Sequence, residues 1–238
     1  MQDVHARIAD AVAKVSRDVQ SVRLLAVSKT FDAQAVVAAA QAGQREFGEN
    51  YLQEALEKID ELTRLQNNGD LPDGLTADLL KWHFIGPIQS NKTRPLAERF
   101  DWVHAVDRLK IAQRLSEQRP AHLPSLNICI QVNISGEDSK SGVSPAELQS
   151  LAHEIAALPR LHLRGLMAIP AASEDPAARR EPFHRLHVLY RQLQDNGLPL
   201  DTLSIGMSAD LEAAIAEGAT IVRIGSAIFG QRDQEVKA

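Results

Sequence analysis

The stretch that decides the fold is LSIGMSADLEAAIAEGATIVRIGSAIFG, which spans residues 203–230. Its pattern predicts a strand, a helix, a second strand and the start of a second helix, with a turn of small residues wherever a strand passes into a helix. The first strand is expected to end at Gly206, and Ser208 is the expected N-cap of a helix that stops at Gly218.

The second strand, 220–224, passes through Gly225 and Ser226 into the next helix. The first N–H groups of a helix have no acceptor inside it and lie at the positive end of its dipole. Two such turns side by side, with the hydroxyls of Ser208 and Ser226, would bind a phosphate group. Paired sites after the last two strands recur in (β/α)8 barrels. The pattern therefore favours a phosphate site, with ordinary turns as the alternative.

The rest of the chain repeats the alternation of strand and helix. Apolar runs predict strands at 22–27, 45–48, 82–85, 102–106, 126–132, 162–169, 202–205 and 220–224. Helical spacing predicts helices at 4–19, from 32, at 52–62, after 107, after 144 and at 176–195. Asp107 is an expected helix cap, and Ser144 and Glu147 form an expected capping box. Eight strands in 238 residues favour a single (β/α)8 TIM barrel domain over 1–238, with a doubly wound open sheet as the alternative.

Composition limits the partners. The net charge of −5, without a block of Lys and Arg, argues against nucleic acid or an anionic membrane surface as the main partner. The N-terminal segment has the pattern of neither a signal peptide nor a transit peptide, and no apolar run is long enough to span a membrane. We therefore expect a cytoplasmic protein. The single cysteine, Cys129, lies in an apolar run and is predicted to be a buried structural thiol.

Lys29 directly follows the first strand, at the end of a barrel where active residues lie. A partly desolvated lysine has a lowered pKa and can form a Schiff base, whereas the alternative is an ordinary surface lysine. A carbonyl cofactor that carries a phosphate would use both this lysine and the phosphate turns. Pyridoxal 5′-phosphate (PLP) is such a cofactor.

Arg223 shares a face of the last strand with Gly225. If it points inward, its guanidinium could meet the pyridine nitrogen of PLP, keep that nitrogen unprotonated and weaken the cofactor as an electron sink. The alternative is a salt bridge inside the barrel. His83 is either a site residue or a satisfied core histidine. The chain has no HExxH motif and no cysteine cluster, so no metal site is predicted.

Six motifs distributed over nearly the whole chain carry a resemblance to a known family. They are AVSKT at 26–30, FGENYLQEA at 47–55, WHFIGPIQSNK at 82–92, VNISGEDSKSG at 132–142, RGLMAIP at 164–170 and SIGMSADLEAAIAEGATIVRIGSAIFG at 204–230. With them the chain resembles the pyridoxal phosphate homeostasis proteins, which look like the barrel domain of alanine racemase standing alone.

The resemblance implies a role for each candidate residue. Lys29 would hold PLP as an internal aldimine. The remaining implied contacts are the phosphate with Ser208, Gly225 and Ser226, the ring nitrogen with Arg223, and the pocket lining with Asn50, His83 and Met207. Lys140 would suit a second cofactor contact, although a solvated loop lysine is the simpler interpretation.

Three functions remain open. The favoured one is a PLP-binding protein that stores, buffers or delivers the cofactor to apo-enzymes with little turnover of its own. A racemase-like enzyme needs a second base, usually a tyrosine from a second domain. The chain ends eight residues after Gly230 and contains only Tyr51 and Tyr190, both expected on helices, which argues against a racemase. The third is a barrel enzyme that acts on another phosphorylated metabolite without PLP.

Overall fold

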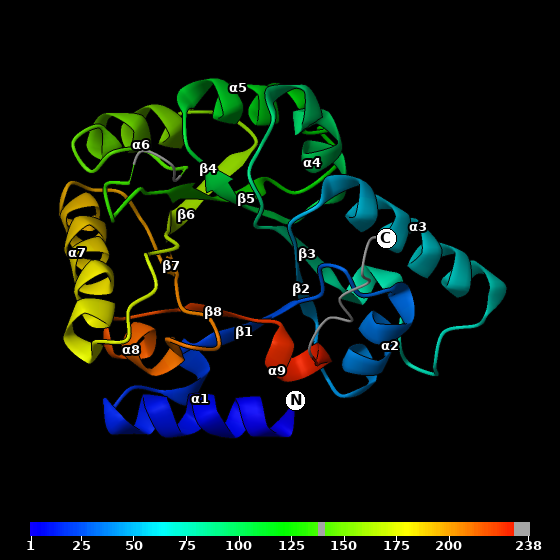
Figure 1. The fold of residues 1–238 in the computed structure, drawn as a ribbon. Coiled ribbons are helices and arrows are strands. Elements are labelled where there is room, and N and C mark those ends of the chain that lie inside the picture. Colours follow the sequence, from blue (N-terminus) through cyan, green and yellow to red (C-terminus); the bar gives the residue numbers. More distant parts are fainter. Residues whose placement is uncertain (138–140, 231–238) are drawn as a thin grey trace, which may run out of the picture.

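The structure, a computed structural model, describes residues 1–137 and 141–230. Eight parallel strands close into a barrel in which each strand pairs with the next and the last pairs with the first (Figure 1). The strands are β1 (Arg23–Val27), β2 (Glu46–Glu49), β3 (Lys81–Phe84), β4 (Trp102–Val106), β5 (Leu126–Gln131), β6 (Leu161–Met167), β7 (Thr202–Ser204) and β8 (Ile221–Ile224). The predicted barrel is confirmed, and the open doubly wound sheet is wrong.

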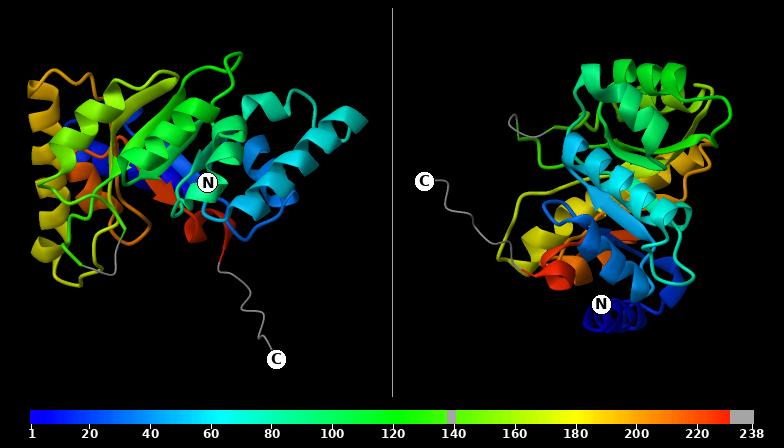
Figure 2. Two further views of the ribbon diagram at one scale, coloured as in Figure 1. Left: turned by 90° about the horizontal axis from the view of Figure 1, so that it is seen from above. Right: turned by 90° about the vertical axis from the view of Figure 1, so that its right-hand side faces the viewer.

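Helices lie around the outside of the strands, and α3 projects from one side (Figures 1 and 2). The α-helices are α1 (Gln2–Lys14), α2 (Ala33–Gln41), α3 (Leu52–Asn68), α4 (Thr93–Arg99), α5 (Leu109–Gln118), α6 (Leu148–Ala156), α7 (Pro176–Asp195), α8 (Leu211–Ala216) and α9 (Ser226–Phe229). Three short 3-10 helices are η1 (Val19–Ser21), η2 (Ala77–Leu79) and η3 (Ser90–Lys92). The predicted bounds of α7 are confirmed. Helix α4 was not expected, because seven residues are too few to show a helical period.

The strands read as continuous apolar runs because they are covered on both faces. Side chains inside the barrel pack against one another, and those outside pack against the helices, in one connected core. Cys129 is fully buried in β5, and burial raises the pKa of its thiol to about 12. The prediction of a buried structural thiol is confirmed. No helix in the two described ranges is both long and apolar enough to cross a membrane.

Several predicted helix ends are wrong. The opening helix stops at Lys14 rather than continuing to Val19, because Ser16 takes a left-handed conformation with φ of 55°. Asp107 does not cap α5; it forms an ion pair with Arg108, which occupies the N-cap position. A cap depends on where the chain turns in three dimensions, which a local pattern specifies only approximately.

The predicted capping box and the N-cap at Ser208 are also wrong. Ser144 donates its hydroxyl to the Glu147 carboxylate at 2.6 Å, and α6 begins only after Glu147. Ser208 lies in a turn ahead of α8, whose N-cap position is occupied by Asp210. The Asp210 carboxylate instead accepts a hydrogen bond from the backbone N–H of Met207 at 2.5 Å.

Candidate functional site

Lys29 lies two residues beyond the C-terminal end of β1 and is half-buried. The backbone on both sides of it is fixed. The N–H of Ser28 donates to the Gly48 carbonyl at 3.1 Å. The N–H of Thr30 donates to the Glu54 carboxylate at 2.5 Å, with Thr30 held at a φ of 69°. A non-glycine residue in this conformation is uncommon and is retained where surrounding contacts impose it.

A buried ion pair lies beneath the Lys29 segment. The Lys58 ammonium donates to Glu49 Oε1 at 2.5 Å and to the Ser28 carbonyl at 2.8 Å. The Ser28 hydroxyl donates to the same Glu49 oxygen at 2.6 Å. Burial raises the pKa of the Glu49 carboxyl, and the Lys58 charge opposes that rise. The pair therefore ties β2 and α3 to the residue before Lys29.

Sequence reasoning missed this pair, although a signal was present. The buried stripe of α3 consists of Ala55, Lys58, Leu62 and Leu65, so a lysine occupies a position that the helical period assigns to the core. A charged residue at such a position is almost never fully buried unless it is paired. The pattern therefore indicated a buried anion, without saying which one.

The turn after β8 lies next to the Lys29 segment, because β8 pairs with β1 with Ile224 opposite Ala26. Helix α9 begins at Ser226 directly after Gly225, as predicted, so the first N–H groups of α9 follow the strand at once. The rings of Phe31 and Phe229 stack with centroids 5.1 Å apart and join the segment after Lys29 to α9. The structure thus brings Lys29 and the second predicted phosphate turn together.

The turn after β7 carries Met207 and Ser208. Gly206 has a φ of +92°, and a Cβ there would come within 2.6 Å of the Ala214 side chain, so the turn requires glycine. The Arg7 side chain donates to the Ser208 carbonyl at 2.7 Å and pairs with Glu212. Helix α1 therefore holds this turn in place, beside the turn of the neighbouring strand β8.

Arg223 is buried inside the barrel, which is the inward orientation that the strand pattern left open. Its Nη1 donates to the carbonyl of Ser204 and, at 2.9 Å, to the Ser204 hydroxyl, and its Nη2 donates to the Ala168 carbonyl at 3.0 Å. These contacts engage three of the five N–H groups of a guanidinium. Burial lowers the pKa of Arg223 to about 10, which leaves it charged at neutral pH. Among the residues that the structure describes, no carboxylate forms a salt bridge with Arg223, so the alternative of an interior ion pair finds no support.

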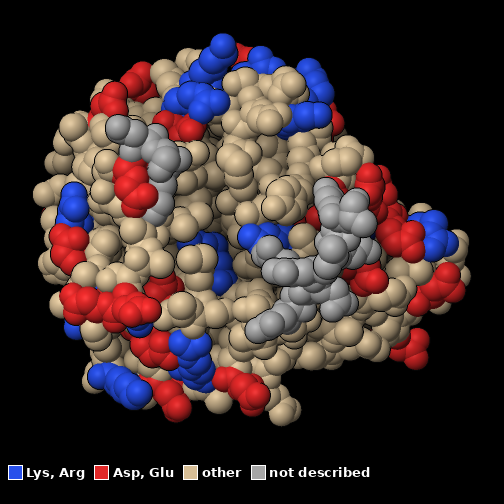
Figure 3. Space-filling model, in the orientation of Figure 1, with Lys and Arg blue, Asp and Glu red and all other residues tan. Residues whose placement is uncertain are grey.

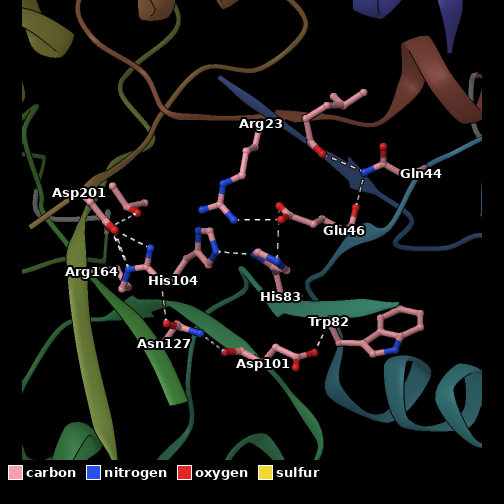
Figure 4. A network of polar contacts seen from close by, with 12 residues as sticks. Arg23, Gln44, Glu46, Trp82, His83, Asp101, His104, Asn127, Arg164 and Asp201 are labelled. Atoms are coloured by element: carbon pink, nitrogen blue, oxygen red, sulfur yellow. Dashed lines mark hydrogen bonds and ion pairs between the residues drawn. The ribbon is translucent and has the colours of Figure 1, made fainter. Parts of the chain in front are cut away.

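His83 is fully buried in β3. Its Nδ1 lies 3.0 Å from His104 Nε2, and its ring stacks on Trp102 with centroids 5.3 Å apart. His83 Nε2 lies 3.8 Å from Glu46 Oε2 (Figure 4). Since Glu46 and Trp102 are the first residues of β2 and β4, these contacts lead toward the N-terminal ends of the strands. Burial lowers the pKa of both histidines well below the usual value, so both rings are neutral.

Polar groups close the barrel around Trp102 at this end. The guanidinium groups of Arg23 and Arg164 lie 4.9 and 4.8 Å from the Trp102 ring. Arg164 also forms a bidentate contact with Asp201 (Figure 4). This arrangement of stacked cations and a paired carboxylate depends on residues of β1, β4 and β6 meeting Asp201, which precedes β7, and the sequence did not predict it.

Asn50, the residue after β2, lines a cavity of about 280 Å³ at the opposite end of the barrel, together with Ile85, Gln131, Asn133 and Ile169. In the described part of the chain, the buried Oδ1 of Asn50 has no hydrogen-bond partner. On the face seen in Figure 3 the centre is hollowed, with Lys and Arg side chains inside the hollow and most Asp and Glu around the rim. Lys140 lies outside the described residues, and within them no three His, Cys, Asp or Glu side chains cluster as metal ligands would.

Comparison with known proteins assigns this barrel to the class of alanine racemase N-terminal domains. Residues 5–233 match the family model described as the N-terminal domain of alanine racemase. An alanine racemase of Clostridium difficile superposes with a TM-score of 0.69 at 15% identity, which shows the shared fold, and this chain spans 58% of that chain.

Relatives of similar length define the family more narrowly. The "Pyridoxal phosphate homeostasis protein" of Pseudomonas aeruginosa is 61% identical over 230 residues, which cover 97% of this chain and 93% of the relative. The protein of the same description from Escherichia coli is 51% identical over 237 residues, which cover 100% and 97%. PipY of Synechococcus elongatus, solved with PLP bound, has a TM-score of 0.77 at 38% identity and covers 94% of this chain and 100% of its own. The chain belongs to the pyridoxal phosphate homeostasis protein family, as its motifs predicted.

Proposed function

We propose that this protein binds PLP and stores, buffers or delivers it, as one PLP-binding barrel domain that spans residues 1–238. The observation that carries the proposal is the buried Arg223, charged but without a carboxylate partner in the described residues, in the strand that leads into the turn beside Lys29. A buried cation with unused donors fits a ligand that supplies an acceptor. The names of the relatives and the PLP in PipY support this choice of ligand.

The residues present fit the three polar parts of PLP. Lys29 would bind the aldehyde carbon covalently through its Nζ. Ser208, Gly225 and Ser226 would bind the phosphate through hydroxyl and backbone N–H groups. An unused N–H of Arg223 would donate to the ring nitrogen. Asn50 and Met207 would line the pocket, and His83 would line it from a deeper position in the barrel. When bound, PLP supplies an aldehyde and an electron-withdrawing ring.

The same residues favour binding over turnover. Arg223 would donate a hydrogen bond to the ring nitrogen of the cofactor and keep its own proton, which would leave that nitrogen unprotonated and make the ring a weaker electron sink. Burial raises the pKa of Tyr190 to about 12, and its hydroxyl donates to the Leu200 carbonyl, so Tyr190 does not serve as a second base. The competing proposal is a racemase-like enzyme, which the shared fold supports. We place the protein in the cytoplasm, with apo-enzymes that require PLP as recipients.

Purified protein loaded with PLP is expected to reactivate an apo-enzyme that needs PLP while turning over no amino acid. The experiment incubates the loaded protein with each of the twenty amino acids, follows chirality and carbon dioxide, and measures reactivation in parallel. Free PLP at the same concentration is the control for release. Turnover of any amino acid at about 1 s⁻¹ or faster would place the protein among ordinary enzymes and contradict the carrier function.

Ser208→Ala and Ser226→Ala are each expected to weaken PLP binding by roughly ten-fold or more. Each variant loses a hydrogen bond to a charged group, worth about 1.5–3 kcal/mol, while the backbone donors remain. Equilibrium dialysis measures the affinity, and thermal unfolding checks that the barrel is intact. Ser150→Ala, an exposed serine on α6, is the matched control. Unchanged affinity in the double variant would show that the phosphate binds elsewhere.

A further inference from the structure

A chain of polar contacts runs through the barrel interior below Arg223. Arg223 Nη1 donates to Ser204 Oγ at 2.9 Å, and Ser204 Oγ lies 2.8 Å from His104 Nδ1. His104 Nε2 lies 3.0 Å from His83 Nδ1. His83 Nε2 faces Glu46 Oε2 at 3.8 Å, and Glu46 pairs with Arg23 through its other oxygen at 2.9 Å. The contacts therefore connect the buried cation at one end of the barrel to a carboxylate at the other (Figure 4 shows the end with Glu46).

The direction of each hydrogen bond follows from its neighbours. Arg223 only donates, so the Ser204 hydroxyl accepts from it and has one proton left to give. The nitrogen of His104 that faces Ser204 is the acceptor for that proton. Neutral His104 then carries its own proton on Nε2 and donates it to His83 Nδ1. His83 in turn carries its proton on Nε2, which faces Glu46.

The reverse order is unfavourable at both ends. If His104 donated to Ser204, the Ser204 proton would have no acceptor among the residues that the structure describes. A lone pair of His83 would also face the Glu46 carboxylate, where two acceptors repel each other. Only the first order gives an acceptor to each donor from Arg223 to His104. In that order the dipoles of these hydrogen bonds all point toward Glu46.

We infer that Ser204 and His104 are positioning residues for Arg223, in a chain of neutral hydrogen bonds in which every link donates toward Glu46. This chain of hydrogen bonds presents only lone pairs to the guanidinium. It therefore takes the place of the carboxylate that a buried arginine ordinarily needs. His104 fixes the rotation of the Ser204 hydroxyl, which in turn fixes Nη1. The importance of this for ligand binding rests on the proposed function, in which Arg223 meets the ring nitrogen of PLP.

The protonation order can be measured without any cofactor. Nitrogen-15 NMR of the wild-type protein, with histidines labelled, reports which ring nitrogen carries the proton. We expect His83 and His104 both to carry it on Nε2 at neutral pH. The Arg223 Nη signals are expected to be resolved, because the bonds to Ser204 and Ala168 hinder rotation of the guanidinium. A proton on Nδ1 of His104, or a doubly protonated ring, would overturn the inference.

Variants test whether this chain of hydrogen bonds acts on Arg223. Ser204→Ala and His104→Leu are expected to average the Arg223 Nη signals and to weaken PLP binding by roughly ten-fold. His104→Asn keeps a polar atom close to the position of Nδ1 and is expected to restore part of the affinity. Ser116→Ala is the matched control, because Ser116 is another buried serine whose hydroxyl donates to a backbone carbonyl far from Arg223.

The outcomes separate the inference from the proposed function. A wild-type protein that binds no PLP but shows the expected tautomers and hindered Arg223 signals contradicts the proposed function alone. A wild-type protein that binds PLP, with Ser204→Ala and His104→Leu no weaker than Ser116→Ala, contradicts the inference alone. If a variant does not fold, the tautomers and the guanidinium signals of the wild-type protein still test the inference. In PLP-loaded samples, the nitrogen-15 shift of the cofactor ring is expected to move in Ser204→Ala and to stay in Ser116→Ala.

Discussion

Lys29→Ala is expected to abolish covalent attachment of PLP while leaving the barrel folded. Lys29 lies beside the turn of Gly225 and Ser226, and among the described residues no other lysine follows a barrel strand there. Borohydride reduction of the loaded wild-type protein, followed by peptide mapping, should place the label on Lys29, and the aldimine absorbance band of the covalently bound cofactor should disappear in the variant. The side chain is half-buried at a loop, so its truncation creates no core cavity.

Lys110→Ala, an exposed lysine at the start of α5, is the control and should retain the label on Lys29. Weak noncovalent binding should persist in Lys29→Ala, because the phosphate turns and Arg223 remain. A label on another lysine of the wild-type protein, including Lys140, would show that the covalent site has been assigned to the wrong residue.

Lys58→Met is expected to lower the free energy of unfolding by about 3–5 kcal/mol, because it leaves a buried carboxylate without its partner. Both side chains of the Lys58 and Glu49 pair are almost fully buried, so solvent screens the interaction little. Urea unfolding measures the change. Arg64→Met, which removes an exposed ion pair on the same helix, is the matched control and should leave the unfolding midpoint unchanged. Equal midpoints for the two variants would contradict a structural role for the buried pair.

Three further measurements sharpen this prediction. The double variant Glu49→Leu with Lys58→Met should recover much of the lost stability, because no unpaired charge remains buried. In Lys58→Met alone, burial raises the pKa of Glu49 and only the hydrogen bond from the Ser28 hydroxyl is left to oppose the rise. A carboxyl whose folded pKa is raised stabilises the fold only while it is protonated, so this variant should be most stable below the unfolded pKa of Glu49 and lose stability as pH rises through the folded pKa. PLP affinity should also fall, since Ser28 loses a bond next to Lys29.

The elements of the barrel, and the residues that follow its strands at one end, could be predicted from the sequence. Apolar runs identified all eight strands, and the predicted helix from Asp32 begins where expected, with the Asp32 carboxylate accepting a hydrogen bond from the N–H of Ala35. The position of Lys29 and of the turn at Gly225 and Ser226 at one end of the barrel could be predicted for a similar reason. Each follows a strand directly, and in a parallel barrel the end of a strand determines which end of the molecule its next residue reaches.

The sequence by itself therefore determined the order of strands and helices, the barrel and which residues stand at its C-terminal end, because these depend on periods and short spacings. Only the tertiary structure decided which buried polar groups meet. Lys58 meets Glu49 across two elements, and His104 meets Ser204 although 100 positions separate them in the chain. Such partners are selected by the closure of the sheet, which places side chains of different strands in one interior, and a local pattern carries no information about that distance.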